Sequence, residues 1–274
     1  MIGQNNLIKQ IDTLIANNNY PKFSIIVGPA GSGKKLICKH IAESLNAFWC
    51  YEPDNKIETI RTVITDAYKV CSLTAYVFTD VDNMSIQAKN ALLKITEEPP
   101  ESAYFIMTVS DLNNVLDTIK SRATMFHTDS YSKSDIEEYV KLKKYGDSDL
   151  YCDLCTTPGE ADKLYTMGAE EFYNYVEKVV DNIAYVSLAN VFKIADKIAL
   201  KPDADGYDLE LFLRAFEKVC VSEMIKSKDN YDDFRYWNAG VKATTRILSL
   251  LQITGINKSA LFDRFIIDVR KEWS

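Results

Sequence analysis

The stretch "IIVGPAGSGKK", residues 25–35, decides the fold of the N-terminal half of this 274-residue chain. An apolar run enters a turn that contains three glycines, and apolar residues at helical spacing follow the turn. This pattern lets backbone N–H groups face an anion at a helix N-terminus, where Lys34 reaches the terminal phosphates. We therefore predict a nucleotide-phosphate site that comprises Gly28, Gly31, Ser32, Gly33, Lys34 and Lys35.

The residues expected to bind a metal beside this loop are altered. Lys35 stands where such loops carry a serine or threonine, whose hydroxyl ligates Mg²⁺. The stretch "YVFTDVDNM", residues 76–84, supplies an acidic strand end, but Thr79 occupies the place of the first acid and leaves Asp80 in the second. Because both positions changed together, we expect no resident metal and no hydrolysis, although ATP or ADP could still bind. Two readings of Asp82 stay open: it braces the next turn, or it restores metal binding together with Asp80.

The first half of the chain alternates β-rich runs with helical patterns, which is typical of a parallel sheet flanked by helices. The five expected strands cover residues 23–27, 47–51, 75–79, 104–108 and 124–128. A helix is expected over residues 56–69, and Ser85 can cap the next helix, which ends before Pro99 because proline cannot continue it. The fold class is therefore α/β with a five-stranded parallel sheet.

Strand signals stop after residue 129, and helical patterns fill the rest of the chain. Four amphipathic helices follow residue 170. Their apolar stripes are Phe172, Val176, Val179, Ile183 and Val186; Leu209, Phe212, Phe216 and Val219; Phe234, Trp237, Val241, Leu248 and Leu251; and Leu261, Phe265 and Val269. We expect a nucleotide-binding-like core over residues 1–128, a small helical lid over 129–169, and an all-α collar or oligomerisation domain over 170–274.

Composition narrows the classes of function. The net charge is −7 and the pI is near 5.1, which argues against a protein that coats DNA by charge neutralisation. No apolar run approaches the roughly 20 residues of a membrane span, and the N-terminus lacks a signal-peptide layout. We expect a cytoplasmic protein with no membrane partner. Cys152 and Cys155 form a CxxC pair without nearby partners, so packing in a short helix is favoured over a metal site.

A longer block resembles a known family. Residues 79–123 read "TDVDNMSIQAKNALLKITEEPPESAYFIMTVSDLNNVLDTIKSRA", and "IGQ" at 2–4 and the glycine-rich loop precede them in the family's order. This pattern resembles the AAA+ clamp-loader subunits of DNA replication, most closely the delta-prime subunits of bacterial DNA polymerase III. The resemblance implies an AAA+ core, a lid and a collar. It covers residues 1–128 strongly and the rest more weakly.

The resemblance also implies roles for single residues. Arg122, in "SRA", matches an arginine that reaches the γ-phosphate of ATP bound by the neighbouring subunit, and Ala123 replaces the cysteine that follows it. Only Cys50 lies between residues 39 and 70, so the zinc module of many relatives is not expected. Glu160, in "PGEA", stands where many relatives carry a basic residue, and an acid there would repel a triphosphate.

The implied assembly is a hetero-oligomeric ring with gamma/tau-like ATPase and delta-like subunits. Such a ring loads a sliding clamp onto primer-template DNA, which this chain would meet through the complex. We expect a non-hydrolysing subunit that supplies Arg122 in trans. Two alternatives stay open: an active ATPase motor subunit of the same complex, and a DNA-binding module that uses Lys89 and Lys94.

Overall fold

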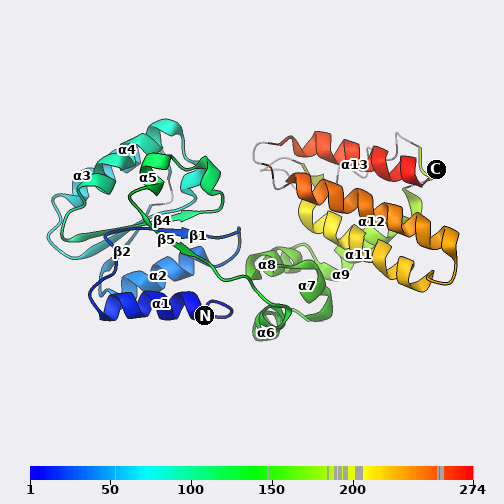
Figure 1. Cartoon of the computed structure of the whole chain (residues 1–274), viewed down its shortest axis with the longest axis horizontal. Helices are drawn as coiled ribbons and strands as arrows, with labels where there is room; N and C mark the ends of the chain where they lie inside the picture. Colours follow the sequence, from blue (N-terminus) through cyan, green and yellow to red (C-terminus); the bar gives the residue numbers. More distant parts are fainter. Residues whose placement is uncertain are drawn as a thin grey trace. The chain divides into compact units, whose positions relative to one another are not determined.

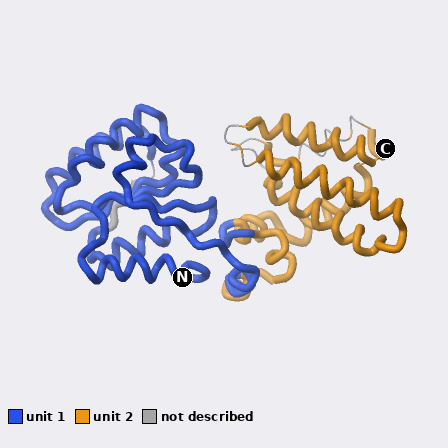
Figure 2. The backbone as a smooth tube through the Cα atoms, viewed as in Figure 1, with its two compact units in different colours: residues 1–139, 156–159 blue, residues 140–155, 160–274 orange. Residues whose placement is uncertain are grey.

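The chain divides into two compact units (Figure 2). The computed structural model describes residues 1–52, 54–146, 148–183, 185–187, 190, 193, 197–200, 206–251, 253 and 256–273. The first unit comprises Met1–Tyr139 and Thr156–Gly159, and the second comprises Val140–Cys155 and Glu160–Ser274. None of the helices in the described part of the chain is long and apolar enough to cross a membrane.

The first unit is built on a five-stranded parallel sheet with the order β2-β3-β4-β1-β5 (Figure 1). Its strands are β1 (Phe23–Val27), β2 (Phe48–Glu52), β3 (Thr74–Phe78), β4 (Ala103–Val109) and β5 (Thr124–His127). All five predicted strands are confirmed, each within one residue of its expected bounds. β1 lies between β4 and β5, so the loop that follows it opens at the carboxyl edge of the sheet.

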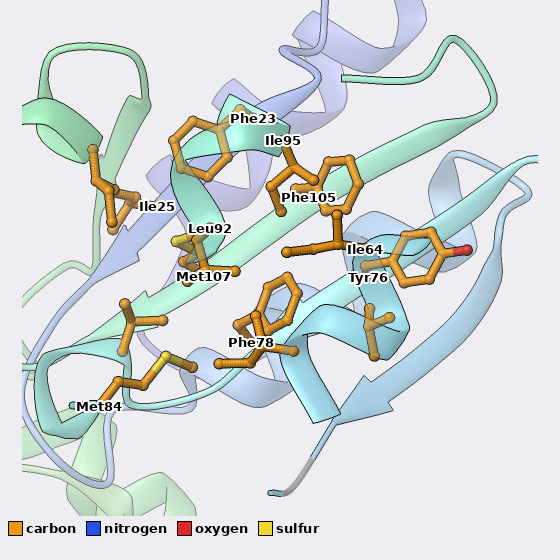
Figure 3. Packing of buried hydrophobic residues seen from close by; sticks show 14 of the residues in the cluster. Phe23, Ile25, Ile64, Tyr76, Phe78, Met84, Leu92, Ile95, Phe105 and Met107 are labelled. Carbon is orange, nitrogen blue, oxygen red and sulfur yellow. The ribbon is translucent and has the colours of Figure 1, made fainter. Parts of the chain in front are cut away.

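Helices cover both faces of this sheet, which explains why the inner strands β1, β3 and β4 are buried along nearly their whole length, whereas the edge strand β5 has exposed ends. They are α1 (Asn5–Ala16), α2 (Lys34–Ser44), α3 (Ile57–Ala67), α4 (Ile86–Glu97) and α5 (Asp117–Lys120), with 3₁₀ turns η1 (Val81–Asn83) and η2 (Leu112–Asn114). Figure 1 shows α3, α4 and α5 on one face and α1 and α2 on the other. Alternate residues of β4 serve the two cores: Phe105 and Met107 pack with Leu92 (Figure 3), and Ile106 packs in the opposite core.

The two ends of α4 follow from local sequence. The Ser85 hydroxyl accepts a hydrogen bond from the backbone N–H of Ala88 at 3.2 Å, which is the predicted N-cap. The helix stops at Glu97, just before the two prolines at 99 and 100. Inner residues Leu92 and Ile95 are fully buried against the sheet, as expected from their spacing. The α4 backbone is therefore fixed by core packing.

The second unit is dominated by helices. They are α7 (Ser148–Leu154), α8 (Pro158–Thr166, which begins in the first unit), α9 (Ala169–Asn182), α11 (Leu209–Lys226), α12 (Tyr231–Leu251) and α13 (Lys258–Glu272). α6 (Lys133–Lys143) spans the boundary between the units, and β6 (Ile198–Ala199) pairs with β7 (Tyr207–Asp208). The four long helices predicted after residue 170 are confirmed as α9, α11, α12 and α13.

The inner face predicted for α12 is wrong. The expected stripe through Phe234, Trp237, Val241, Leu248 and Leu251 is only half-buried, and the buried face is formed by Gly240, Ala243, Thr244 and Ile247. The reason is close packing at Gly240, where an added Cβ would lie 2.6 Å from the Trp273 ring and 3.0 Å from the Cys220 sulfur. A helix that approaches its neighbours this closely buries its small residues, and larger apolar ones are left at the edge.

The CxxC pair lies at the end of a short helix, as expected. Cys152 is half-buried within α7, and Cys155 follows the helix and is buried. Burial is the main cause that raises the pKa of the Cys155 thiol to about 12, so this thiol stays protonated at neutral pH. A protonated thiol is a poor metal ligand and a poor nucleophile, which favours a packing role for Cys155.

Candidate functional site

The glycine-rich loop connects β1 to α2 as predicted. Gly31 and Gly33 have φ values of +77° and +80°, a region that favours glycine, and α2 begins at Lys34. Gly28 faces Thr128, whose hydroxyl oxygen would lie 2.1 Å from an added Cβ. The loop therefore needs its glycines for backbone shape and for close approach. Its tip, at Pro29, Ala30 and Gly31, is exposed.

Lys34 is folded onto its own loop. Its Nζ donates to the carbonyl oxygens of Gly28 at 2.7 Å and Pro29 at 2.9 Å, and to the Ser110 hydroxyl at 3.0 Å. Only 7% of the residue is exposed. Burial lowers the pKa of Lys34, although the carboxylates of Asp80 and Asp82 act in the opposite direction. If phosphate oxygens replaced these neutral acceptors, the Lys34 ammonium would gain a negatively charged partner. The loop therefore suits a phosphate group.

The residues beside the loop do not fit a magnesium ion. Lys35 is exposed and offers an ammonium group in place of a hydroxyl. Ser32, in the same loop, is buried, and its hydroxyl donates to the Pro29 carbonyl at 2.8 Å. Thr79 is also buried, and its carbonyl oxygen accepts from the Asn55 side chain at 3.1 Å. Mg²⁺ prefers several oxygen ligands in octahedral geometry, and Asp80 alone keeps an acid at the strand end.

Asp82 braces a loop, but the loop is the distant one that follows β4 and not the next turn that was expected. Its Oδ2 accepts from the backbone N–H groups of Ser110 at 3.3 Å and Asp111 at 3.1 Å. The second carboxylate oxygen, Oδ1, is buried and has no hydrogen-bond partner among the described residues. Asp82 thus holds Ser110 in the position where its hydroxyl meets the Lys34 ammonium.

Two further side chains at the loop were missed by reasoning from sequence. Thr157 donates through its hydroxyl to the Ala30 carbonyl at 3.2 Å, and Tyr131 donates through its hydroxyl to the Ser32 carbonyl at 2.9 Å. The Gly159 N–H donates to the Gly31 carbonyl at 3.1 Å, and a Cβ on Gly159 would lie 2.4 Å from the Gly31 Cα. The "TTPG" turn was visible in the sequence, but its long-range partner was not.

Ser110 was also missed, although the sequence carried a signal for it. It directly follows β4, the strand that pairs with β1. In a parallel sheet, residues that follow adjacent strands meet at the carboxyl edge, where ligands bind. A polar residue after an apolar strand next to the loop-bearing strand is therefore a candidate ligand neighbour.

Glu160 is paired within the second unit. Its carboxylate accepts from the Arg214 guanidinium at 2.8 Å, and the Leu154 carbonyl and the Glu210 carboxylate accept from the same guanidinium. Burial would lower the pKa of Arg214, but the carboxylates of Glu160 and Glu210 outweigh it and raise that pKa. The Glu160 carboxylate is thus neutralised by Arg214. This ion pair explains the acid at position 160 without any role in triphosphate binding.

Arg122 lies just after α5, where its side chain remains 37% exposed. One terminal nitrogen donates to the Thr118 carbonyl at 2.8 Å, and the other donates to the Glu97 carboxylate at 3.0 Å. Ala123, the residue that follows, packs against the main core of the first unit. The backbone at Arg122 is therefore anchored, and its guanidinium is accessible from outside.

Lys89 cannot serve as the exposed DNA contact that was considered. It is only 6% exposed, and its Nζ donates to the backbone carbonyls of Asp82 at 2.9 Å and Asn114 at 2.6 Å. The helical spacing placed Lys89 on an outer face, but η1 and η2 cover that face with carbonyl groups. Lys94 is exposed and lies over the Tyr68 ring. Of the two lysines considered for DNA contact, only Lys94 is therefore accessible.

Comparison with protein families gives one match within this chain. Residues 52–131 match the family model described as "DNA polymerase III, delta subunit". The matched segment contains the strand end at Thr79 and Asp80, the helix α4 and Arg122, and it excludes the glycine-rich loop.

Curated relatives come from bacterial and archaeal replication. The DNA polymerase III subunit gamma of Buchnera aphidicola (subsp. Schizaphis graminum) is 28% identical over 180 residues, which cover 54% of this chain and 50% of that protein. The subunit tau of Bacillus subtilis is 26% identical over 156 residues, covering 46% of this chain and 28% of that protein. The replication factor C small subunit of Methanothermobacter thermautotrophicus is 27% identical over 138 residues, covering 46% and 43%. The chain spans about half the length of the first of these relatives.

Solved structures support the fold. The RuvB Holliday junction branch migration motor of Thermotoga maritima superposes with a TM-score of 0.51 at 14% identity, covering 99% of this chain and 87% of that one. At this identity the likeness concerns the fold alone, and it confirms the predicted parallel sheet flanked by helices with a helical C-terminal region. The chain is therefore similar to clamp-loader subunits of DNA replication: residues 52–131 match the DNA polymerase III delta model, and DNA polymerase III gamma and tau subunits are among its relatives.

Proposed function

We propose that this chain is a delta-prime-type subunit of a DNA polymerase III clamp loader and that it supplies Arg122 to ATP bound by a neighbouring subunit. The observation that carries the proposal is an exposed, backbone-anchored arginine in the family-matched segment, in a chain whose own loop lacks magnesium ligands. An exposed guanidinium can reach a second molecule. A loop without a hydroxyl at 35 and a strand end without an acid at 79 lack two of the groups that position the metal in hydrolysing relatives of this loop.

Arg122 would act by electrostatic stabilisation. A guanidinium presents five N–H donors in a planar fork that matches phosphate oxygens. As the γ-phosphoryl group is transferred, charge develops on its oxygens, and a fixed cation from outside the ATP-binding subunit stabilises that charge. Trans arginines of this kind contribute about 10³-fold or more to the rate. The chain itself breaks no bond in this scheme.

The loop of this chain would hold a nucleotide as a structural ligand. Its glycine-rich backbone, exposed at Gly31, and the Lys34 ammonium suit the phosphates of ATP or ADP, and such binding needs no metal. The Gly31–Gly159 backbone contact lies one residue before the chain enters the second unit at Glu160. A bound phosphate that shifts the Gly31 backbone would therefore also shift Gly159, the second residue of α8.

The second unit would provide the contacts that join the ring. The half-buried apolar stripe on α12, formed by Phe234, Trp237, Val241, Leu248 and Leu251, is the face that we assign to a neighbouring subunit. With the gamma/tau-like ATPase and delta-like subunits, the ring would load a sliding clamp onto primer-template DNA in the cytoplasm. The division into core, lid and collar belongs to this proposal.

The proposal is tested by reconstitution with the gamma/tau-type ATPase and delta-type subunits encoded in the same genome. Arg122→Ala should lower the DNA-stimulated ATP turnover of the complex by at least about tenfold while the subunits still assemble, since trans arginines contribute about 10³-fold or more. Arg61→Ala, which removes an exposed arginine from α3 of the same unit, is the matched control and should leave turnover unchanged. Unchanged turnover with Arg122→Ala would refute the trans role.

The alternative, an active ATPase motor subunit of the same complex, has one observation in its favour. Asp82 keeps a buried carboxylate oxygen without a partner among the described residues, close enough to Lys34 to influence its pKa, and Asp80 lies nearby. These two acids could ligate a metal in place of the altered positions. Magnesium-dependent ATP hydrolysis by the purified chain, abolished by Lys34→Ala, would favour this alternative.

A further inference from the structure

The guanidinium of Arg122 is held at two points, one on each side of its fork. The nearer point is the Thr118 carbonyl, one turn back along α5, at 2.8 Å. The other is the carboxylate of Glu97, the last residue of α4, at 3.0 Å. Because a carbonyl contact alone leaves the fork free to rotate, the Glu97 contact is the one that fixes its direction.

Helix α4, which ends at Glu97, and helix α5, which ends two residues before Arg122, are fixed to each other. Leu92 and Ile95 of α4 and Ile119 of α5 are fully buried in the same core cluster. Glu97 and Arg122 therefore meet without any rearrangement of the backbone. The separation of 25 residues in sequence makes this a built contact between elements rather than a local helical pair.

Glu97 stands at a position where a carboxylate has an unfavourable electrostatic environment. The C-terminus of a helix carries partial negative charge, which favours cations there. The neighbouring Glu98 has the same charge and forms no ion pair within the described part of the chain, and its backbone carbonyl accepts from the Tyr68 hydroxyl. Of the two adjacent acids, Glu97 alone meets the arginine.

We propose that Glu97 is a positioning residue for Arg122, an inference that rests on the trans role proposed above. The Glu97 side chain is 57% exposed, and exposed ion pairs are weak. The pair thus orients the guanidinium without trapping it, and phosphate oxygens of a neighbouring subunit can replace one of its two acceptors. Pre-orientation of the fork reduces the rotamer freedom that must be lost when the transition state forms.

The test uses the reconstituted complex with Glu97→Gln in this chain. Loss of the carboxylate should lower kcat of the DNA-stimulated ATP turnover by about two- to fivefold, the rate equivalent of one exposed ion pair. The KM for ATP should stay unchanged, because ATP is bound by the neighbouring subunit. Glu98→Gln is the matched control and should leave kcat unchanged.

A double variant separates positioning from a general structural effect. Glu97→Gln should have no further effect on kcat in an Arg122→Ala background, since residues that act through one another are not additive. If Arg122→Ala itself leaves turnover unchanged, the proposed function fails. If Arg122→Ala lowers turnover but Glu97→Gln leaves kcat unchanged, raises it, or acts additively, the positioning role of Glu97 is overturned.

Discussion

At the scale of single residues, Lys34 and Arg122 of the first unit differ in how accessible their charges are. Lys34 and Arg122 both donate to backbone carbonyls, but Lys34 is almost fully buried and the Arg122 side chain remains 37% exposed. Lys34 is therefore committed to its own loop, and Arg122 can be reached by a second molecule. The same contrast holds for two lysines of α4, since Lys89 is buried on carbonyl oxygens and Lys94 is exposed.

Burial of Lys34 has a consequence for stability. Its pKa is lowered from 10.5, so between the lowered value and 10.5 the unfolded chain holds a proton that the folded chain has lost. Stability rises with pH wherever the unfolded state binds more protons. The unfolding free energy of the wild type, relative to Lys34→Met, should thus increase as the pH rises toward 10.5.

Urea denaturation at a series of alkaline pH values measures this difference. Lys35→Met removes the same charge from the exposed neighbouring position and controls for net charge. A difference that shrinks with rising pH would mean that the Lys34 ammonium is stabilised, and not penalised, in the folded loop.

Single elements show what the sequence could and could not predict. The inner strands β1, β3 and β4 were predictable because both of their faces are covered, and near-continuous apolar runs result. The Ser85 cap was predictable because its partner is three residues away. The buried face of α12 was not, since it depends on Gly240 meeting Trp273 across the unit. The contact of Gly159 with Gly31 was not predictable either, because the two residues are far apart in sequence.

The two faces of α12 should respond differently to substitution. Ile247→Ala, on the fully buried face, should lower the free energy of unfolding by about 2 to 5 kcal/mol because it leaves a cavity. Leu248→Glu, on the half-buried stripe, should cost less stability and instead weaken assembly with the other subunits. Urea denaturation and size-exclusion chromatography of the reconstituted complex report the two effects. Normal assembly with Leu248→Glu would remove this stripe from the interface.

At the scale of the whole molecule, the first unit carries a glycine-rich loop with altered flanking residues and an accessible arginine. The altered residues Lys35 and Thr79 and the block around Arg122 are visible in the sequence because they are local features, and their roles belong to the proposal. The contacts that complete the site are long-range: Ser110 on Lys34, Tyr131 on Ser32, and Glu97 on Arg122. Local patterns in a single sequence do not reveal such pairs, and the structure supplies them.

ATP turnover by the reconstituted complex, with Arg122→Ala and Lys34→Ala compared side by side in this chain, tests the trans role most directly. If the chain donates a cation and hydrolyses nothing, Arg122→Ala should reduce the DNA-stimulated rate by at least about tenfold. Lys34→Ala should leave that rate unchanged, once circular dichroism and assembly confirm that the variant is folded. Loss of turnover with Lys34→Ala and normal turnover with Arg122→Ala would contradict the proposal, because ATP would then be broken in the chain's own loop.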